Sequence, residues 1–94
     1  MRLEAENHGD MNLVGSQIRR IRLNKGMTQK QLIVCLRHRG MSISKSSYSR
    51  IEQHMRKVKD YELYKIAKCL GVRINDLFPD AVQSQIIDCA VSHK

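Results

Sequence analysis

The sequence predicts a small all-α domain, and three observations support that fold class. Apolar residues recur at the three- and four-residue spacing of helices through residues 13 to 79. Gly26, Gly40 and Gly71 follow periodic segments at positions where a helix would end. Only 4% of the 94 residues are aromatic, so the single modest core that a chain of this length can bury must be aliphatic.

The first predicted helix starts after Asn12, where periodicity begins. Val14, Ile18 and Ile21 recur at helical spacing, and Gly26 supplies the left-handed residue that ends the helix. We therefore expect one amphipathic helix between these two positions.

The second predicted helix begins at Thr28, a good N-cap. The threonine hydroxyl can accept a hydrogen bond from the backbone N–H of Lys30 or of Gln31, two or three residues on. Gly40 ends this helix. Its apolar stripe comprises Leu32, Cys35 and Leu36.

The third predicted helix spans about residues 44–53 and is capped by Ser44 or Ser46. Tyr48 and Ile51 are spaced to face the core. The other face presents only basic and neutral polar residues to solvent: Lys45, Ser46, Ser49, Arg50 and Gln53. Two short helices in succession, with the second one carrying this outward face, are typical of a helix-turn-helix.

Two further helices are expected. The fourth runs from about Asp60 to Leu70 and ends at Gly71, with acids at its start and lysines nearer its end, as the helix dipole favours. The fifth is short, is built on apolar residues between 72 and 78, is capped by Asn75 or by the residue before Ile74, and is broken by Pro79.

Positive charge is concentrated on the two-helix segment. Between Arg19 and Lys59 there are twelve Lys and Arg residues and a single acid, Glu52, whereas the rest of the chain is net acidic although the total is +8. This distribution is the electrostatic footprint of a surface that docks on phosphates.

The remaining segments suggest a simple organisation. Residues 1–12 are polar and aperiodic, which predicts a disordered N-terminal arm, residues 13–79 form the domain, and residues 80–94 form a short tail or helix. Cys35, Cys69 and Cys89 are an odd number with no close pair, so we expect small buried hydrophobes in a reducing cytosol and no disulfide framework. The lack of a signal peptide or a spanning apolar run predicts a cytoplasmic, nucleoid-associated protein without membrane contact.

Residues 13–79 resemble the Cro and lambda-repressor-like helix-turn-helix family. The resemblance lies in the order and spacing of several segments: residues 18–22 (IRRIR), 26–29 (GMTQ), Leu32, residues 48–52 (YSRIE), 61–63 (YEL), 66–67 (IA), 70–72 (LGV) and 76–78 (DLF). The connection from Leu36 to Ser44 is several residues longer than the tight turn usual in the family, a variant that some members share.

This resemblance implies a five-helix domain whose third helix lies in the major groove of double-stranded DNA. The apolar spacing of the tail, independently, predicts a short C-terminal helix. Transferred onto this sequence, the base-reading positions are Lys45, Ser46, Ser49 and Arg50. Lys and Arg can donate to the O6 and N7 acceptors of guanine, so Arg50 is the leading candidate for specific readout. The alternative is that Lys45 and Arg50 merely solvate an exposed helix face.

The resemblance also implies phosphate contacts and a structural ion pair. Gln29 matches the residue that fixes a backbone phosphate, although it could be simply an exposed residue in a first turn. Further phosphate contacts are expected from cations outside the third helix: Arg56, Lys57 and Lys59 in the following loop, assisted by Lys30 and Arg39. Glu52 is expected to pair with Arg22, the alternative being acceptance from a cytosine amino group.

Enzymatic, metal and cofactor functions find no support. Cys35 and His38 have the spacing of half a metal site, but no second close pair completes four ligands. The serines of residues 42–49 have no nearby His and Asp constellation, and the glycines form no phosphate-cradling loop. We therefore expect no catalytic residues, no metal and no cofactor.

The sequence thus predicts a DNA-binding transcriptional regulator that represses by occupying an operator, as a homodimer on a pseudo-palindrome. The tail could supply part of the dimer contact or pack back on its own domain. A first alternative is an antitoxin-type module whose tail binds a protein partner of unknown identity while the helix-turn-helix regulates its own operon. A second is non-specific nucleic-acid binding through the basic segment.

Overall fold

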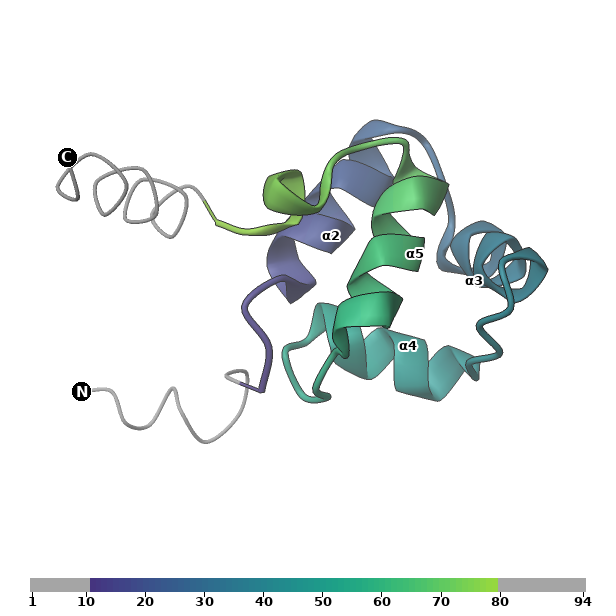
Figure 1. Cartoon of the computed structure of the whole chain (residues 1–94), viewed down its shortest axis with the longest axis horizontal. Helices are drawn as coiled ribbons and strands as arrows, with labels where there is room; N and C mark the ends of the chain where they lie inside the picture. Colours follow the sequence, from purple (N-terminus) through teal and green to yellow (C-terminus); the bar gives the residue numbers. More distant parts are fainter. Residues whose placement is uncertain (1–10, 80–94) are drawn as a thin grey trace, which may run out of the picture.

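The computed structural model describes residues 11–79, and these form four α-helices and one short 3-10 helix (Figure 1). They are α2 (Gly15–Asn24), α3 (Gln29–His38), α4 (Lys45–Glu52), α5 (Asp60–Leu70) and η1 (Ile74–Leu77). Most of the predicted arm and the whole predicted tail lie outside the described residues. Within residues 11–79, every helix is too short or too polar to cross a membrane.

Local hydrogen bonds begin the two helices of the helix-turn-helix, as predicted. The Thr28 hydroxyl accepts from the N–H of Gln31 at 3.0 Å, and the Gln31 side chain accepts from the N–H of Thr28 at 2.8 Å, which completes a capping box. At the start of α4 the cap is Ser44, whose hydroxyl accepts from the N–H of Ser47 at 3.1 Å. Both helices therefore start where their sequences contain a side-chain acceptor.

The predicted helix ends are confirmed at Gly26, Gly40 and Gly71, which all have positive φ. The fifth predicted helix is corrected, since residues 74–77 form a 3-10 turn instead of an α-helix. Its hydrogen bonds span three residues, as from the N–H of Phe78 to the carbonyl of Asn75, and the following Pro79 has no N–H with which to continue a helix.

The helices enclose a core that is aliphatic except for Tyr48, and each helix contributes buried side chains to it. α3 packs on α4 and α5, α2 packs on α4, and η1 packs on α5 and α2 (Figure 1). The largest fully buried side chains are Tyr48, Ile18, Leu32, Leu36, Ile51, Ile66, Leu70 and Leu77. Burial of these apolar groups is the main source of the stability of the fold.

Gly15 allows α2 to approach the end of α4 closely. A Cβ atom at this position would lie 2.2 Å from the carbonyl oxygen of Ile51 and 3.0 Å from that of Glu52. Both neighbours are backbone atoms, so they could move away only if one helix moved relative to the other. The smallest residue therefore sets how near α2 lies to the C-terminal end of α4.

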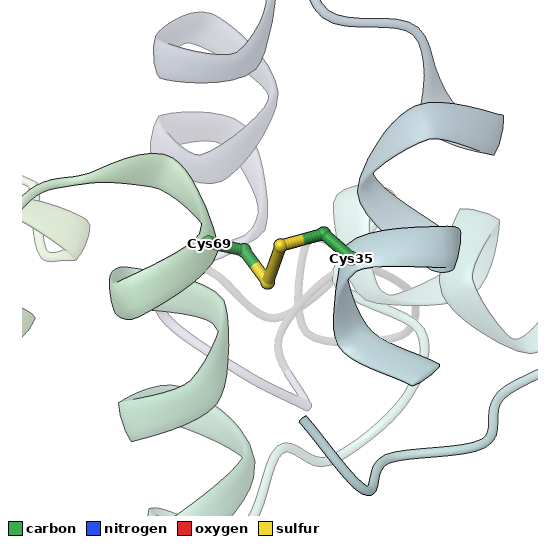
Figure 2. Close-up of a disulfide and its surroundings, with 2 residues drawn as sticks. All are labelled: Cys35 and Cys69. Carbon is green, nitrogen blue, oxygen red and sulfur yellow. A yellow bond between two sulfur atoms is a disulfide. The ribbon is translucent and has the colours of Figure 1, made fainter. Parts of the chain in front are cut away.

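Cys35 of α3 and Cys69 of α5 form a disulfide, which corrects the expectation that both are simply buried hydrophobes (Figure 2). They are separated by 34 residues in sequence, with Cα atoms 6.0 Å apart. The absence of a close cysteine pair in the sequence suggested no bridge, but the packing of α3 against α5 brings the two side chains together. Cys89 lies outside the described residues.

Candidate nucleic-acid interface

The outward face of α4 is exposed and basic. Lys45, Ser46 and Arg50 are exposed, whereas Ser49 is half-buried. The inward face of the same helix is anchored by Tyr48 and Ile51, both 0% exposed. The four residues expected to read bases therefore lie on the polar face of a helix whose opposite face is buried in the core.

Glu52, the only acid of α4, is turned into the protein and is 6% exposed. Its carboxylate accepts from Arg22 of α2 through two bonds, Nε–Oε2 at 2.7 Å and Nη2–Oε1 at 3.1 Å. Nη1 of Arg22 donates in addition to the carbonyl oxygen of Met27 at 2.8 Å. The two residues that the resemblance pairs are thus brought together, in the fork geometry that Arg and a carboxylate favour.

Two further donors complete the surroundings of Glu52. The hydroxyl of Tyr48, one turn earlier in α4, donates to Oε2, and Nε2 of Gln29 donates to Oε1 at 3.1 Å. Burial alone would raise the pKa of Glu52, but hydrogen bonds from Arg22, Tyr48 and Gln29 bring that pKa below its ordinary value. The carboxylate is therefore ionised inside the protein, and its charge is balanced there.

Gln29 links the start of α3 to α4. Its side-chain oxygen Oε1 accepts from the hydroxyl of Ser49 at 3.1 Å, while its side-chain nitrogen Nε2 donates to the carboxylate of Glu52. The residue expected to hold a phosphate and one of the residues expected to read bases are therefore joined directly. This contact restrains the two side chains relative to each other.

Asn12 and His54 position the other end of α4, and sequence reasoning missed both. The Asn12 side chain donates to the carbonyls of Ile51 at 3.1 Å and Arg56 at 2.8 Å, and accepts from the N–H groups of Val14 and Gly15 at the start of α2. An Asn two residues before a helical pattern is a local signal for such a cap. Asn12, at the end of the predicted arm, is thus hydrogen-bonded to the start of α2 and to the end of α4 and the loop after it.

His54 ends α4 in a left-handed conformation, with φ of 63°. Its ring nitrogens contact the hydroxyl of Ser16 at 2.6 Å and the carbonyl oxygen of Asn12 at 3.0 Å, and its own carbonyl accepts from the N–H of Met11 at 3.0 Å. Only a few non-glycine residues adopt this conformation. Its several contacts explain why a histidine holds it here.

Arg56, one of the cations expected to bind phosphates, has a partner within the protein. Its guanidinium pairs with the carboxylate of Glu62 at 3.1 and 3.2 Å, and Glu62 also accepts from the N–H of Lys59 at the start of α5. Burial raises the pKa of Glu62, but the bonds from Arg56 and Lys59 outweigh it and leave that pKa low. Arg56 therefore holds the loop after α4 in place.

The other expected phosphate contacts are cations at the surface. Lys30 follows the N-terminus of α3, Arg39 follows its last turn, and Lys57 and Lys59 lie in the loop between α4 and α5; all four are exposed. These residues flank α4 on both sides in the sequence. Such contacts position a protein on DNA without reading its sequence.

Comparison with known proteins agrees with this architecture. Residues 17–80 match the sequence profile of the Cro/C1-type HTH DNA-binding domain. No curated protein and no solved structure matches the chain significantly. Because the matched region covers well over half of the 94 residues, the chain belongs to the Cro/C1-type helix-turn-helix family and is a DNA-binding transcription regulator.

Proposed function

We propose that the protein is a sequence-specific repressor that occupies an operator in double-stranded DNA, with α4 lying in the major groove. Lys45, Ser46, Ser49 and Arg50 face the bases, and Arg50 is the main reader because its guanidinium can donate two hydrogen bonds to one guanine. A second copy of the chain binds the other half of a pseudo-palindromic site, since one module of this size covers limited DNA surface.

One observation carries this proposal: Glu52, the only acid between Arg19 and Lys59, is buried. Glu52 is 6% exposed and its charge is balanced by Arg22. The exposed charges between Arg19 and Lys59 are therefore all positive, and they include Lys45 and Arg50 of α4 itself. A surface of one sign attracts the phosphate backbone and lets a short helix approach the bases.

Residues on both sides of α4 contact the phosphate backbone of the DNA. Gln29 and Lys30 bind a phosphate at the N-terminus of α3, where the free N–H groups and the helix dipole favour an anion. Lys57 and Lys59 bind phosphates on the other flank, with Arg39 assisting from the end of α3. Arg56 is left out of this set because Glu62 holds its guanidinium.

The proposal is tested by selecting bound duplexes from a random library at near-physiological salt. Wild type is compared with Arg50→Ala and with the charge-matched control Arg73→Ala, which removes an exposed arginine of the η1 region. We expect a two-fold-symmetric motif for wild type and for the control. Arg50→Ala should lose the preference at one base pair in each half-site, worth about 1–3 kcal/mol.

Lys57→Ala separates positioning from reading. We expect it to weaken all sequences alike and to lower the salt slope of binding by about one, with the selected motif unchanged. If no motif is enriched although binding depends on salt, the protein is a generic DNA binder and sequence-specific repression is refuted. A one-sided motif would refute the dimer, and an unchanged motif in Arg50→Ala would refute Arg50 as a reader.

A further inference from the structure

The cysteine pair lies between two helices in a place that small molecules can reach. Cys35 and Cys69 face each other across the contact of α3 with α5 (Figure 2). Both residues are partly exposed, whereas their sequence neighbours Leu36 and Leu70 are 0% and 1% exposed. The Cα separation of 6.0 Å is in the range that a disulfide bridges without movement of the backbone.

Positively charged residues occur on both helices that carry the pair. Lys65 of α5 reaches the end of α3, where its Nζ lies 3.8 Å from the position of a Cβ at Gly40. Further positive residues in the sequence are Lys68, one position before Cys69, and Arg37 and Arg39, two and four positions after Cys35. Nearby cations stabilise a thiolate over a thiol.

We propose that Cys35 and Cys69 form a reversible redox couple whose oxidant is a small hydroperoxide. One thiolate attacks a peroxide oxygen, the O–O bond breaks, and an alcohol or water leaves while a sulfenic acid forms. The second thiol attacks that sulfur, the S–S bond forms, and water leaves. The two cysteines lose two electrons and two protons in total, and the peroxide gains them. A low-molecular-weight thiol reverses the reaction through a mixed disulfide.

Oxidation closes a loop of 34 residues and stabilises the domain without altering the proposed DNA-binding surface. Cys35 lies six residues along α3 from Gln29, about 9 Å along the helix axis. The bridge therefore restrains the unfolded chain and leaves the Gln29–Ser49 contact in place. For a loop of this length we expect the Tm of the oxidised protein to be on the order of 15 °C above that of the reduced protein.

The experiment compares the full chain after reduction and after treatment with one equivalent of hydrogen peroxide. Free thiols are counted by maleimide alkylation under denaturing conditions, and Tm is measured by circular dichroism. In a Cys89→Ser background we expect two adducts on the reduced protein, none on the oxidised protein, and the full rise in Tm. The variants Cys35→Ser and Cys35→Ala should show no rise in Tm after peroxide treatment. Oxidised wild type should retain one maleimide adduct, at Cys89.

Three results would overturn the proposal. The first is two adducts persisting in the Cys89→Ser protein after peroxide treatment, because the pair then does not oxidise. The second is loss of both thiols with no change in Tm, because the bridge then does not restrain this fold. The third is a rise in Tm that survives in Cys35→Ala, because the rise then has another source. The comparison of oxidised with reduced wild type requires no variant to fold.

Discussion

Replacement of Glu52 by Gln tests the buried network at its centre. The change removes the negative charge but keeps nearly the same shape, so Arg22 stays 6% exposed without an anionic partner. Removing one member of a buried pair costs about 3–5 kcal/mol, because the remaining charge is left uncompensated. A domain of this size has a total stability of only about 5–14 kcal/mol.

We therefore expect Glu52→Gln to lower the free energy of unfolding by about 3 kcal/mol, the low end of that range, since the amide oxygen can still accept one bond from Arg22. The assay is urea unfolding followed by circular dichroism, with Tm expected to fall by about 12 °C or more. The double variant Arg22→Leu/Glu52→Leu is the control. It should recover much of the loss, because an apolar pair leaves no buried charge.

The result that refutes this reasoning is a Glu52→Gln protein within about 0.5 kcal/mol of wild type, the range of ordinary surface substitutions. Unchanged unfolding together with a changed base preference would assign Glu52 to a cytosine contact instead. A loss in the double variant as large as in the single one would show that packing at this site, and not the unpaired charge, controls stability.

Three further predictions concern a helix–helix contact, a helix cap and the pH dependence of stability. Gly15→Ala should destabilise the domain by about 2 kcal/mol in urea unfolding, because the new Cβ meets the carbonyl oxygen of Ile51 at 2.2 Å and this overpacking outweighs the better helix propensity of Ala. Ser44→Ala should cost about 1 kcal/mol in the same assay, because α4 loses its N-cap. Stability should be nearly constant above about pH 5.5 and should fall below about pH 4.5, because folding lowers the pKa values of Glu52 and Glu62 and the unfolded chain then binds protons more readily.

Each of these three predictions has a control or an outcome that would contradict it. Ser42→Ala, in the exposed loop before α4, should change stability by less than about 0.5 kcal/mol, and a loss equal to that of Ser44→Ala would contradict the assignment of the cap. Glu62→Gln should make the acid-side slope shallower, whereas an unchanged slope would attribute it to other carboxylates. A Gly15→Ala protein as stable as wild type would show that α2 can move away from α4 at no cost.

Helix positions could be read from the sequence because their signals are local. Thr28 and Ser44 begin α3 and α4 through hydrogen bonds to residues three positions on, and Gly71 ends α5 by its own backbone conformation. Such signals need no knowledge of distant residues. The same locality explains the error at residues 74–77, where apolar spacing alone cannot distinguish an α-helix from a 3-10 turn.

The concentration of positive charge on the helix-turn-helix segment could also be read from the sequence, because charge is carried by residue identity. The partners of the charged side chains could not, because they depend on the packing of the helices. The tertiary structure turns Glu52 inward onto Arg22 and Tyr48, and it occupies Arg56 with Glu62. These pairings depend on how the helices and the connecting loop pack, and no periodicity within one helix contains that information.

Contacts between segments that are distant in the sequence also depend on how the helices pack. Asn12 reaches the carbonyl oxygens of Ile51 and Arg56, and Cys35 meets Cys69, across separations of 34 to 44 residues. Local propensities establish where each helix begins and ends along the chain. Burial of the shared aliphatic core then sets the crossing angles, and those angles decide which distant side chains meet.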